Sequence, residues 1–185
     1  MNEIYEERRF CVGPGEWDER VARLRAAAGA RLFGVFRGQI GLDANEGVLL
    51  AVYSEPEALA DALRGAQRVS AARMFATSRP AEPCAPKWRP GVYAFRSFDV
   101  RAANAKEFTR LSESAWPEFE SAYDAQIIGL WRNLDVPAPD ARFHLLTRYA
   151  SLACWEASRA DVGRPAFAQR AKLTLATRVV TTTLA

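Results

Sequence analysis

The chain has 185 residues, of which 49% are hydrophobic and 25% are charged, a composition typical of a globular protein. Its 25 basic and 22 acidic residues are interspersed, without the basic stripe that most nucleic-acid-binding proteins carry. No apolar run approaches the roughly 20 residues needed to span a bilayer, so we expect neither membrane insertion nor nucleic-acid binding.

The amino terminus and the cysteines indicate a cytoplasmic protein. Residues 1–10 are charged where a secretory signal would need an apolar stretch. Cys11, Cys84 and Cys154 are odd in number and far apart, which is typical of reduced thiols. With a single histidine they do not make a usual structural zinc site, and we expect no metal and no cofactor.

The first half of the chain alternates between strand and helix patterns. Residues rich in β-branched and aromatic side chains predict strands at 3–12, 31–42, 48–53 and 68–78. A helix is expected from about Pro14, because apolar residues recur at helical spacing at Trp17, Val21, Leu24 and Ala28. A second helix, capped by Ser54, is expected before the fourth strand.

After the proline-rich residues 80–91, the second half follows the same plan. Strands are predicted from Val92 to residue 100 and at 125–134, 142–150 and 178–184. A long helix, which Pro117 should kink or restart, presents an apolar side made of Phe108, Leu111, Ala115, Phe119 and Ala122. Further helices are expected from Leu152 and from Pro165, the latter with Phe167, Ala171 and Leu175 inward.

The two halves are similar in sequence as well as in pattern. Residues 4–12 (IYEERRFCV) match 92–100 (VYAFRSFDV), and 30–37 (ARLFGVFR) match 125–132 (AQIIGLWR). Residues 47–54 (GVLLAVYS) match 143–150 (FHLLTRYA) in the same order. Three ordered matches indicate a duplication. It predicts an α+β fold of two tandem ferredoxin-like βαββαβ units, 1–79 and 92–185, joined by the linker 80–91.

A single βαββαβ unit covers one face of its sheet with helices and leaves the other face bare. That apolar face needs a partner, which a second unit in the same chain supplies at high effective concentration. We therefore expect the units to pack sheet to sheet as a pseudo-dimer resembling a dimeric α/β-barrel. Pairing across a homodimer is the alternative; pairing within the chain is favoured.

The same segments resemble the NIPSNAP family. Residues 5–8 (YEER) lead into the turn 12–15 (VGPG) and the helix start 17–19 (WDE). The second half keeps Tyr93 and the Trp116-Pro117 pair, but its turn at 100–103 departs from the pattern. The resemblance implies a dimeric α/β-barrel and brings no catalytic signature. The wider superfamily includes cofactor-free monooxygenases, polyketide cyclases, haem-degrading enzymes and binding proteins, and the fold does not choose between them.

Candidate site residues come from places where the two halves differ. Val48, Leu50 and Val52 alternate on one face of their strand, and the second half places His144, Leu146 and Arg148 there. On the first strand Glu6 and Arg8 share a face, where an ion pair is possible. Their counterparts are Ala94 and Arg96, so the acidic neighbour has gone.

This divergence predicts a positively charged cluster of Arg96, His144 and Arg148 inside the barrel. Unpaired arginines are costly to bury, so the cluster needs an anion, either a protein carboxylate or a ligand carboxylate, phenolate or enolate. Trp131 and Arg132 are added as candidate ligand-binding residues. His144 is the candidate acid or base, with a hydrogen-bonded structural histidine as the alternative.

The sequence leaves three functions open. In the first, the protein binds a small anionic or aromatic molecule between its sheets. Alternatively, it is a cofactor-free enzyme of the monooxygenase, cyclase or isomerase type that uses His144. The third possibility is a structural module with a fully packed barrel.

Overall fold

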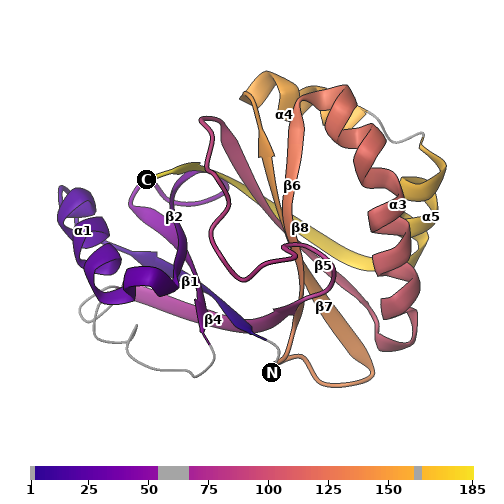
Figure 1. Ribbon diagram of the computed structural model, residues 1–185, viewed down its shortest axis with the longest axis horizontal. Coiled ribbons are helices and arrows are strands. Elements are labelled where there is room, and N and C mark those ends of the chain that lie inside the picture. Colours follow the sequence, from indigo (N-terminus) through magenta and orange to yellow (C-terminus); the bar gives the residue numbers. More distant parts are fainter. Residues whose placement is uncertain (1–2, 54–66, 161–163) are drawn as a thin grey trace.

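The computed structural model describes residues 3–53, 67–160 and 164–185, and within them an eight-stranded sheet is flanked by helices (Figure 1). The strands are β1 (Ile4–Cys11), β2 (Leu32–Ile40), β3 (Glu46–Tyr53), β4 (Gln67–Ala76), β5 (Val92–Arg101), β6 (Ala125–Asn133), β7 (Asp140–Tyr149) and β8 (Thr174–Leu184). The helices are α1 (Trp17–Ala28), α3 (Ala105–Tyr123), α4 (Leu152–Ala160) and α5 (Pro165–Leu173).

The strands close into one barrel in the order β1-β3-β2-β8-β5-β7-β6-β4. Each half contributes four neighbouring strands in the same order, with its first and third strands side by side in the middle. The edges join through two antiparallel pairs within the chain, β2 with β8 and β4 with β6. The predicted fold class is therefore confirmed, and pairing within the chain is what closes the barrel.

Aromatic rings fill the space between the two sheets. Trp131 packs against Tyr5 and Phe33, with ring centroids 5.5 and 6.1 Å apart. Phe36 packs against Phe95, with centroids 5.0 Å apart. These residues belong to one buried cluster with strand residues from both halves. Shape-matched aromatic burial of this kind stabilises the closed barrel and occupies its centre.

Trp88 brings the linker into this cluster. Its ring meets the rings of Phe33, Phe36 and Tyr93 edge-on, with centroids 5.8, 5.4 and 5.5 Å apart. Figure 1 shows the linker crossing the front of the barrel between β4 and β5. The linker thus does more than connect the halves, because its tryptophan packs on the core that they share.

A glycine in each half makes room for one of these rings. A Cβ on Gly34 would lie 2.8 Å from the ring of Phe36, and a Cβ on Gly129 would lie 2.3 Å from the ring of Trp131. The strand register shifts at both glycines. The repeated Gly-x-aromatic pattern therefore has a steric cause, since the ring folds back over the glycine two residues before it.

The helices lie outside the barrel, α1 over the first half and α3, α4 and α5 over the second (Figure 1). As predicted, Trp17, Val21, Leu24 and Ala28 form the buried side of α1. None of the helices in the described residues is long and apolar enough to cross a membrane.

Some details differ from the sequence-based expectations, and one expected helix lies outside the described residues. Helix α3 runs unbroken through Pro117, and Ala122 on it is exposed. The last strand begins at Thr174, four residues earlier than predicted, because its threonines continue the β-branched run. Leu175 therefore lies on a strand and is 56% exposed. The helix expected after Ser54 falls outside the described residues.

The linker tryptophan gives a direct test of the packed interior. We expect Trp88→Ala to lower the free energy of unfolding by about 2–4 kcal/mol, because it removes a ring packed on three others. Urea denaturation measures the change. The neighbouring exposed Lys87→Ala is the matched control and should change stability by less than about 0.5 kcal/mol. Equal stabilities for the two variants would contradict the role given to Trp88.

Candidate functional site

The structure separates the cluster that the sequence predicted. His144 and Arg148 lie on the same face of β7 as Leu146, which belongs to the barrel core, so both face the inside as expected. Arg96 pairs in register with Leu145, on the outer face of the same sheet. The prediction that Arg96 joins His144 and Arg148 inside the barrel is wrong. Alternation shows which residues of one strand share a face, but only the register between strands says which faces coincide.

His144 is held by side chains inside the barrel. Its Nδ1 lies 3.0 Å from Glu7 Oε2 of the first half, and its Nε2 lies 3.3 Å from the side-chain amide of Asn133. Burial raises the pKa of the Glu7 carboxyl, but the charge and hydrogen bond of His144, together with those of Arg9, lower it to about 2. The pair joins the two halves across the interior.

The remaining candidate residues, Arg148, Trp131 and Arg132, do not line a common site. Arg148 donates to the carbonyl of Pro90 at 2.7 Å and lies 3.2 Å from a carboxylate oxygen of Asp124. Trp131 is fully buried in the aromatic core. Arg132 is opposite Phe143 in the register and therefore lies on the outer face, but it is not part of the pocket described next.

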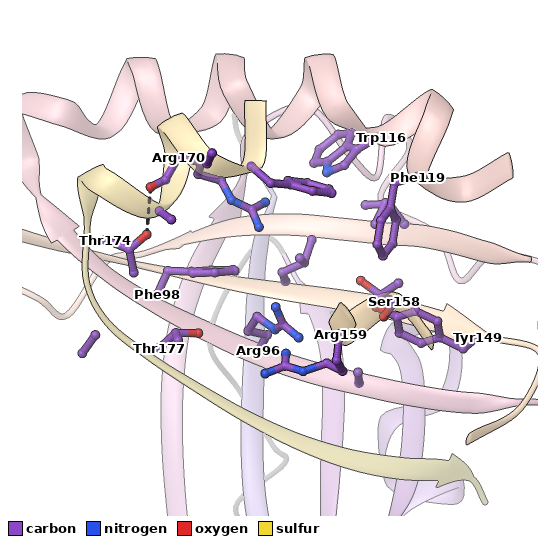
Figure 2. Close-up of a pocket in the computed structure, with 18 of the residues that line it drawn as sticks. Arg96, Phe98, Trp116, Phe119, Tyr149, Ser158, Arg159, Arg170, Thr174 and Thr177 are labelled. Atoms are coloured by element: carbon purple, nitrogen blue, oxygen red, sulfur yellow. Dashed lines mark hydrogen bonds between the residues drawn. The ribbon is translucent and has the colours of Figure 1, made fainter. Parts of the chain in front are cut away.

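A pocket of about 510 Å³ lies outside the barrel, between the second-half sheet and helices α3, α4 and α5. Its floor is the outer face of β5, β7 and β6, and its walls include Trp116, Phe119 and Phe167 from the helices. Figure 2 shows Arg170 entering from α5 and Arg96 from the sheet below it, with Arg159 beside Arg96. The lining is mostly apolar and aromatic, with three arginines among it.

Among the described residues no acidic side chain lines this pocket, and none forms an ion pair with Arg96, Arg159 or Arg170. Arg170 lies over the rings of Phe98 and Phe167, 4.9 and 4.8 Å from their centroids, and makes a long 3.4 Å contact with the hydroxyl of Ser112. Ring faces offset part of the cost of burying a guanidinium. They do not neutralise its charge.

The arginines act on one another through their charges. Burial, and then the charge of Arg96, lower the pKa of Arg170 to about 10, although Tyr149 acts in the opposite direction. Burial and then the charge of Arg159 lower the pKa of Arg96. Both directions mean that the surroundings disfavour the charged form, as expected for cations that have been desolvated without a counter-ion.

In the first half, the arginine equivalent to Arg96 is paired with a carboxylate. There Arg8 forms an ion pair with Glu6, which confirms the pair that the sequence suggested. In the second half Ala94 stands where Glu6 would be, and both Ala94 and Arg96 line the pocket. Without a carboxylate at this position, Arg96 is a cation that faces a cavity.

Tyr149 contributes a buried hydroxyl to the same pocket. The residue is 3% exposed and lines the pocket together with Ser158 of α4. Burial raises the pKa of Tyr149, while Ser158 and the charges of Arg96, Arg159 and Arg170 act in the opposite direction.

The sequence predicted Arg96 as part of an anion-binding cluster, but it placed that cluster inside the barrel. It gave no role to Arg159, Arg170 or Tyr149, which line the pocket. Arg170 follows Phe167 by three residues, so a helical pattern places both on one side, and this signal was available. Tyr149 matches Tyr53 of the first half, and such a recurrence by itself favours a structural role. A repeated residue can still face a cavity in only one copy.

The residues present do not fit a histidine-bound haem in the pocket. The chain has one histidine, and His144 lies inside the barrel with Glu7 and Asn133. No group of three or more potential metal ligands occurs in the described part of the chain.

No protein-family model and no curated protein matches the chain. Solved structures do resemble it along its whole length. A putative monooxygenase from Lactobacillus acidophilus has a TM-score of 0.61 at 11% identity, covering 100% of this chain and 94% of that chain. A chlorite dismutase variant from Candidatus Nitrospira defluvii has a TM-score of 0.57 at 11% identity, covering 100% and 92%. These likenesses establish a ferredoxin-like α/β-barrel of two units and no activity, since one fold hosts different chemistries.

The resemblance to NIPSNAP proteins is weaker at the level of structure. A NIPSNAP domain protein from Burkholderia xenovorans has a TM-score of 0.37 at 15% identity and covers 49% of this chain and 90% of that chain. The fold is established by the whole-length matches, and it is the broader ferredoxin-like α/β-barrel.

The buried pair of Glu7 and His144 predicts a pH dependence of stability. The folded-state pKa of Glu7 is about 2 against an ordinary value of 4.5, so its contribution is complete above about pH 4.5 and is lost as the pH falls towards 2. We expect Glu7→Gln to lower the free energy of unfolding by about 3 kcal/mol at pH 7. Urea denaturation between pH 7 and 2 should show this difference shrinking below about pH 4.5.

Glu19→Gln is the control for this experiment. Glu19 pairs with Arg23 on the surface, where both side chains are more than half exposed. Its replacement should cost less than about 0.5 kcal/mol at pH 7. A Glu7→Gln difference that stayed constant down to pH 2 would show that the charge of Glu7 contributes nothing.

Proposed function

We propose that this protein binds a small molecule with a negatively charged group on an apolar, aromatic body, in the pocket between the second-half sheet and helices α3, α4 and α5. The observation that carries the proposal is the group of three pocket arginines without a carboxylate partner among the described residues. A ligand carboxylate, phenolate or enolate would supply the missing counter-charge.

The shape and lining of the pocket support the apolar part of the ligand. Trp116, Phe119 and Phe167 present ring faces and edges along the cavity, and its volume of about 510 Å³ lies in the range of small-molecule sites. The rings of the barrel core occupy the space between the sheets, where the sequence suggested a ligand.

A cofactor-free enzyme of the monooxygenase, cyclase or isomerase type is the second candidate. It is favoured by the buried hydroxyl of Tyr149 beside cations in the pocket, and by fold neighbours that include a putative monooxygenase. The catalytic role predicted for His144 stays a prediction, and its bonds to Glu7 and Asn133 favour the structural alternative.

The remaining sequence-based expectations belong to the same proposal. We propose that the units 1–79 and 92–185, joined by 80–91, arose by duplication and that the second unit alone carries the ligand site. Membership in the NIPSNAP family, a cytoplasmic location and assembly into a homodimer are proposed on the sequence resemblance and composition described above.

Isothermal titration with 2-naphthoate tests the charge requirement. We expect Arg96→Gln to weaken binding by about 10- to 100-fold, since a hydrogen bond to an ionised group is lost. Ala94→Glu should abolish binding, because it recreates beside Arg96 the carboxylate that Glu6 provides beside Arg8. Arg132→Gln, on the same face but outside the pocket, should bind as the wild type does. If 2-naphthoate and its neutral amide bound equally, the proposal would fail.

The unliganded protein offers a second test that needs no ligand. We expect Arg96→Met to raise the free energy of unfolding by about 1 kcal/mol, because a desolvated cation without a counter-ion is replaced by an apolar chain. Arg8→Met is the matched control and should lower stability, since it removes a partner of Glu6. Chemical denaturation of both variants measures the contrast. Equal destabilisation by both would indicate that Arg96 has a structural role.

A further inference from the structure

The three pocket arginines carry more positive charge than one carboxylate neutralises. They come from different elements, Arg96 from β5, Arg159 from α4 and Arg170 from α5. Figure 2 shows their guanidiniums in a row, with Arg96 between the other two. In agreement with this order, the charge of Arg159 lowers the pKa of Arg96, and the charge of Arg96 lowers the pKa of Arg170. A carboxylate that bridges Arg96 and Arg170 therefore leaves Arg159 at the end of the row.

The same arginines bring hydrogen-bond donors to the pocket without matching acceptors. A guanidinium has N–H donors only. In the part of the chain that the structure describes, the side chains of Arg96 and Arg159 make no hydrogen bond, and Arg170 makes only its long contact with Ser112. Arg159 lies over the ring of Trp155, 5.8 Å from its centroid, a contact that uses none of its N–H groups. Carboxylates are the acceptors that suit such donors best.

The apolar walls determine where on the ligand the acidic groups can be. Figure 2 shows Trp116 and Phe119 of α3 on the side of the pocket away from Arg159. An aromatic body packed on these rings directs one of its ends towards the row of arginines. Two acidic groups at that end both meet cations, whereas an acidic group at the opposite end would lie among the rings without a counter-ion.

We propose that the ligand carries two neighbouring anionic groups at one end of its aromatic body, the first bound by Arg96 and Arg170 and the second by Arg159. This inference rests on the proposed function and adds the number and the position of the acidic groups. Arg159 is the residue that distinguishes such a dianion from an acid with one charge. Because Arg159 is exposed, water screens its charge and the gain in affinity is moderate.

Isothermal titration at about pH 8 compares three acids that share one ring system: 2-naphthoate, naphthalene-2,3-dicarboxylate and naphthalene-2,6-dicarboxylate. All their carboxyls are ionised at this pH. We expect the 2,3-diacid to bind the wild type about 5- to 10-fold more tightly than 2-naphthoate. The 2,6-diacid should bind more weakly than 2-naphthoate, although its charge equals that of the 2,3-diacid.

Arg159→Gln should reduce the ratio of the affinities for the 2,3-diacid and 2-naphthoate to about 1. The ratio cancels any general effect of the lost charge on the pocket. Lys172→Gln is the control, because it removes one positive charge from an exposed position of α5 that does not line the pocket. It should leave the ratio unchanged.

The two proposals fail in different ways. If 2-naphthoate bound and the 2,3-diacid gained nothing, or if the 2,6-diacid gained as much, the inference would be overturned while the proposed function stood. A ratio that Arg159→Gln left unchanged would overturn it as well. If none of the three acids bound the wild type, the proposed function itself would be wrong.

Discussion

The edges of the two four-stranded sheets pair with each other, and everything else in the molecule follows from that closure. A ferredoxin-like sheet has a bare apolar face and two unpaired edges, both of which favour association. Here β2 pairs with β8 and β4 with β6, so the sheet closes within the chain. Closure brings the bare faces together, and aromatic residues from both halves and from the linker fill the space between them. The interior is then a core, which moves the candidate ligand site outside the barrel.

The two halves keep one architecture but differ in charge. In the first half Glu6 neutralises Arg8 on the outer face of the sheet, whereas in the second half Arg96 has Ala94 beside it and faces a cavity. Arg159 and Arg170 add positive charge from α4 and α5. Desolvated cations without a counter-ion reduce stability, a cost that is typical of functional sites.

Sequence alone predicted the duplication, the order of the elements and the strand faces of β3 and β7. The matched segments located the repeat, and the 88-residue offset between Glu6 and Ala94 exposed the lost carboxylate. The site was misplaced because the phase between β1 and β3 is a property of their register, which alternation within one strand does not encode. The pocket itself depends on how α3, α4 and α5 pack on the sheet. Arg170 and Tyr149 are 21 residues apart in the sequence, and only this packing brings both of them into the lining of one pocket.

The central claim is that the barrel is filled and that the ligand lies outside it, under the second-half helices. The most direct test is a crystal structure of the protein with 6-bromo-2-naphthoate, with the bromine located by anomalous diffraction. The account predicts one bromine peak between the outer face of β5 and helix α5, with the carboxylate on Arg96 and Arg170. A peak inside the barrel beside His144 and Trp131 would contradict it.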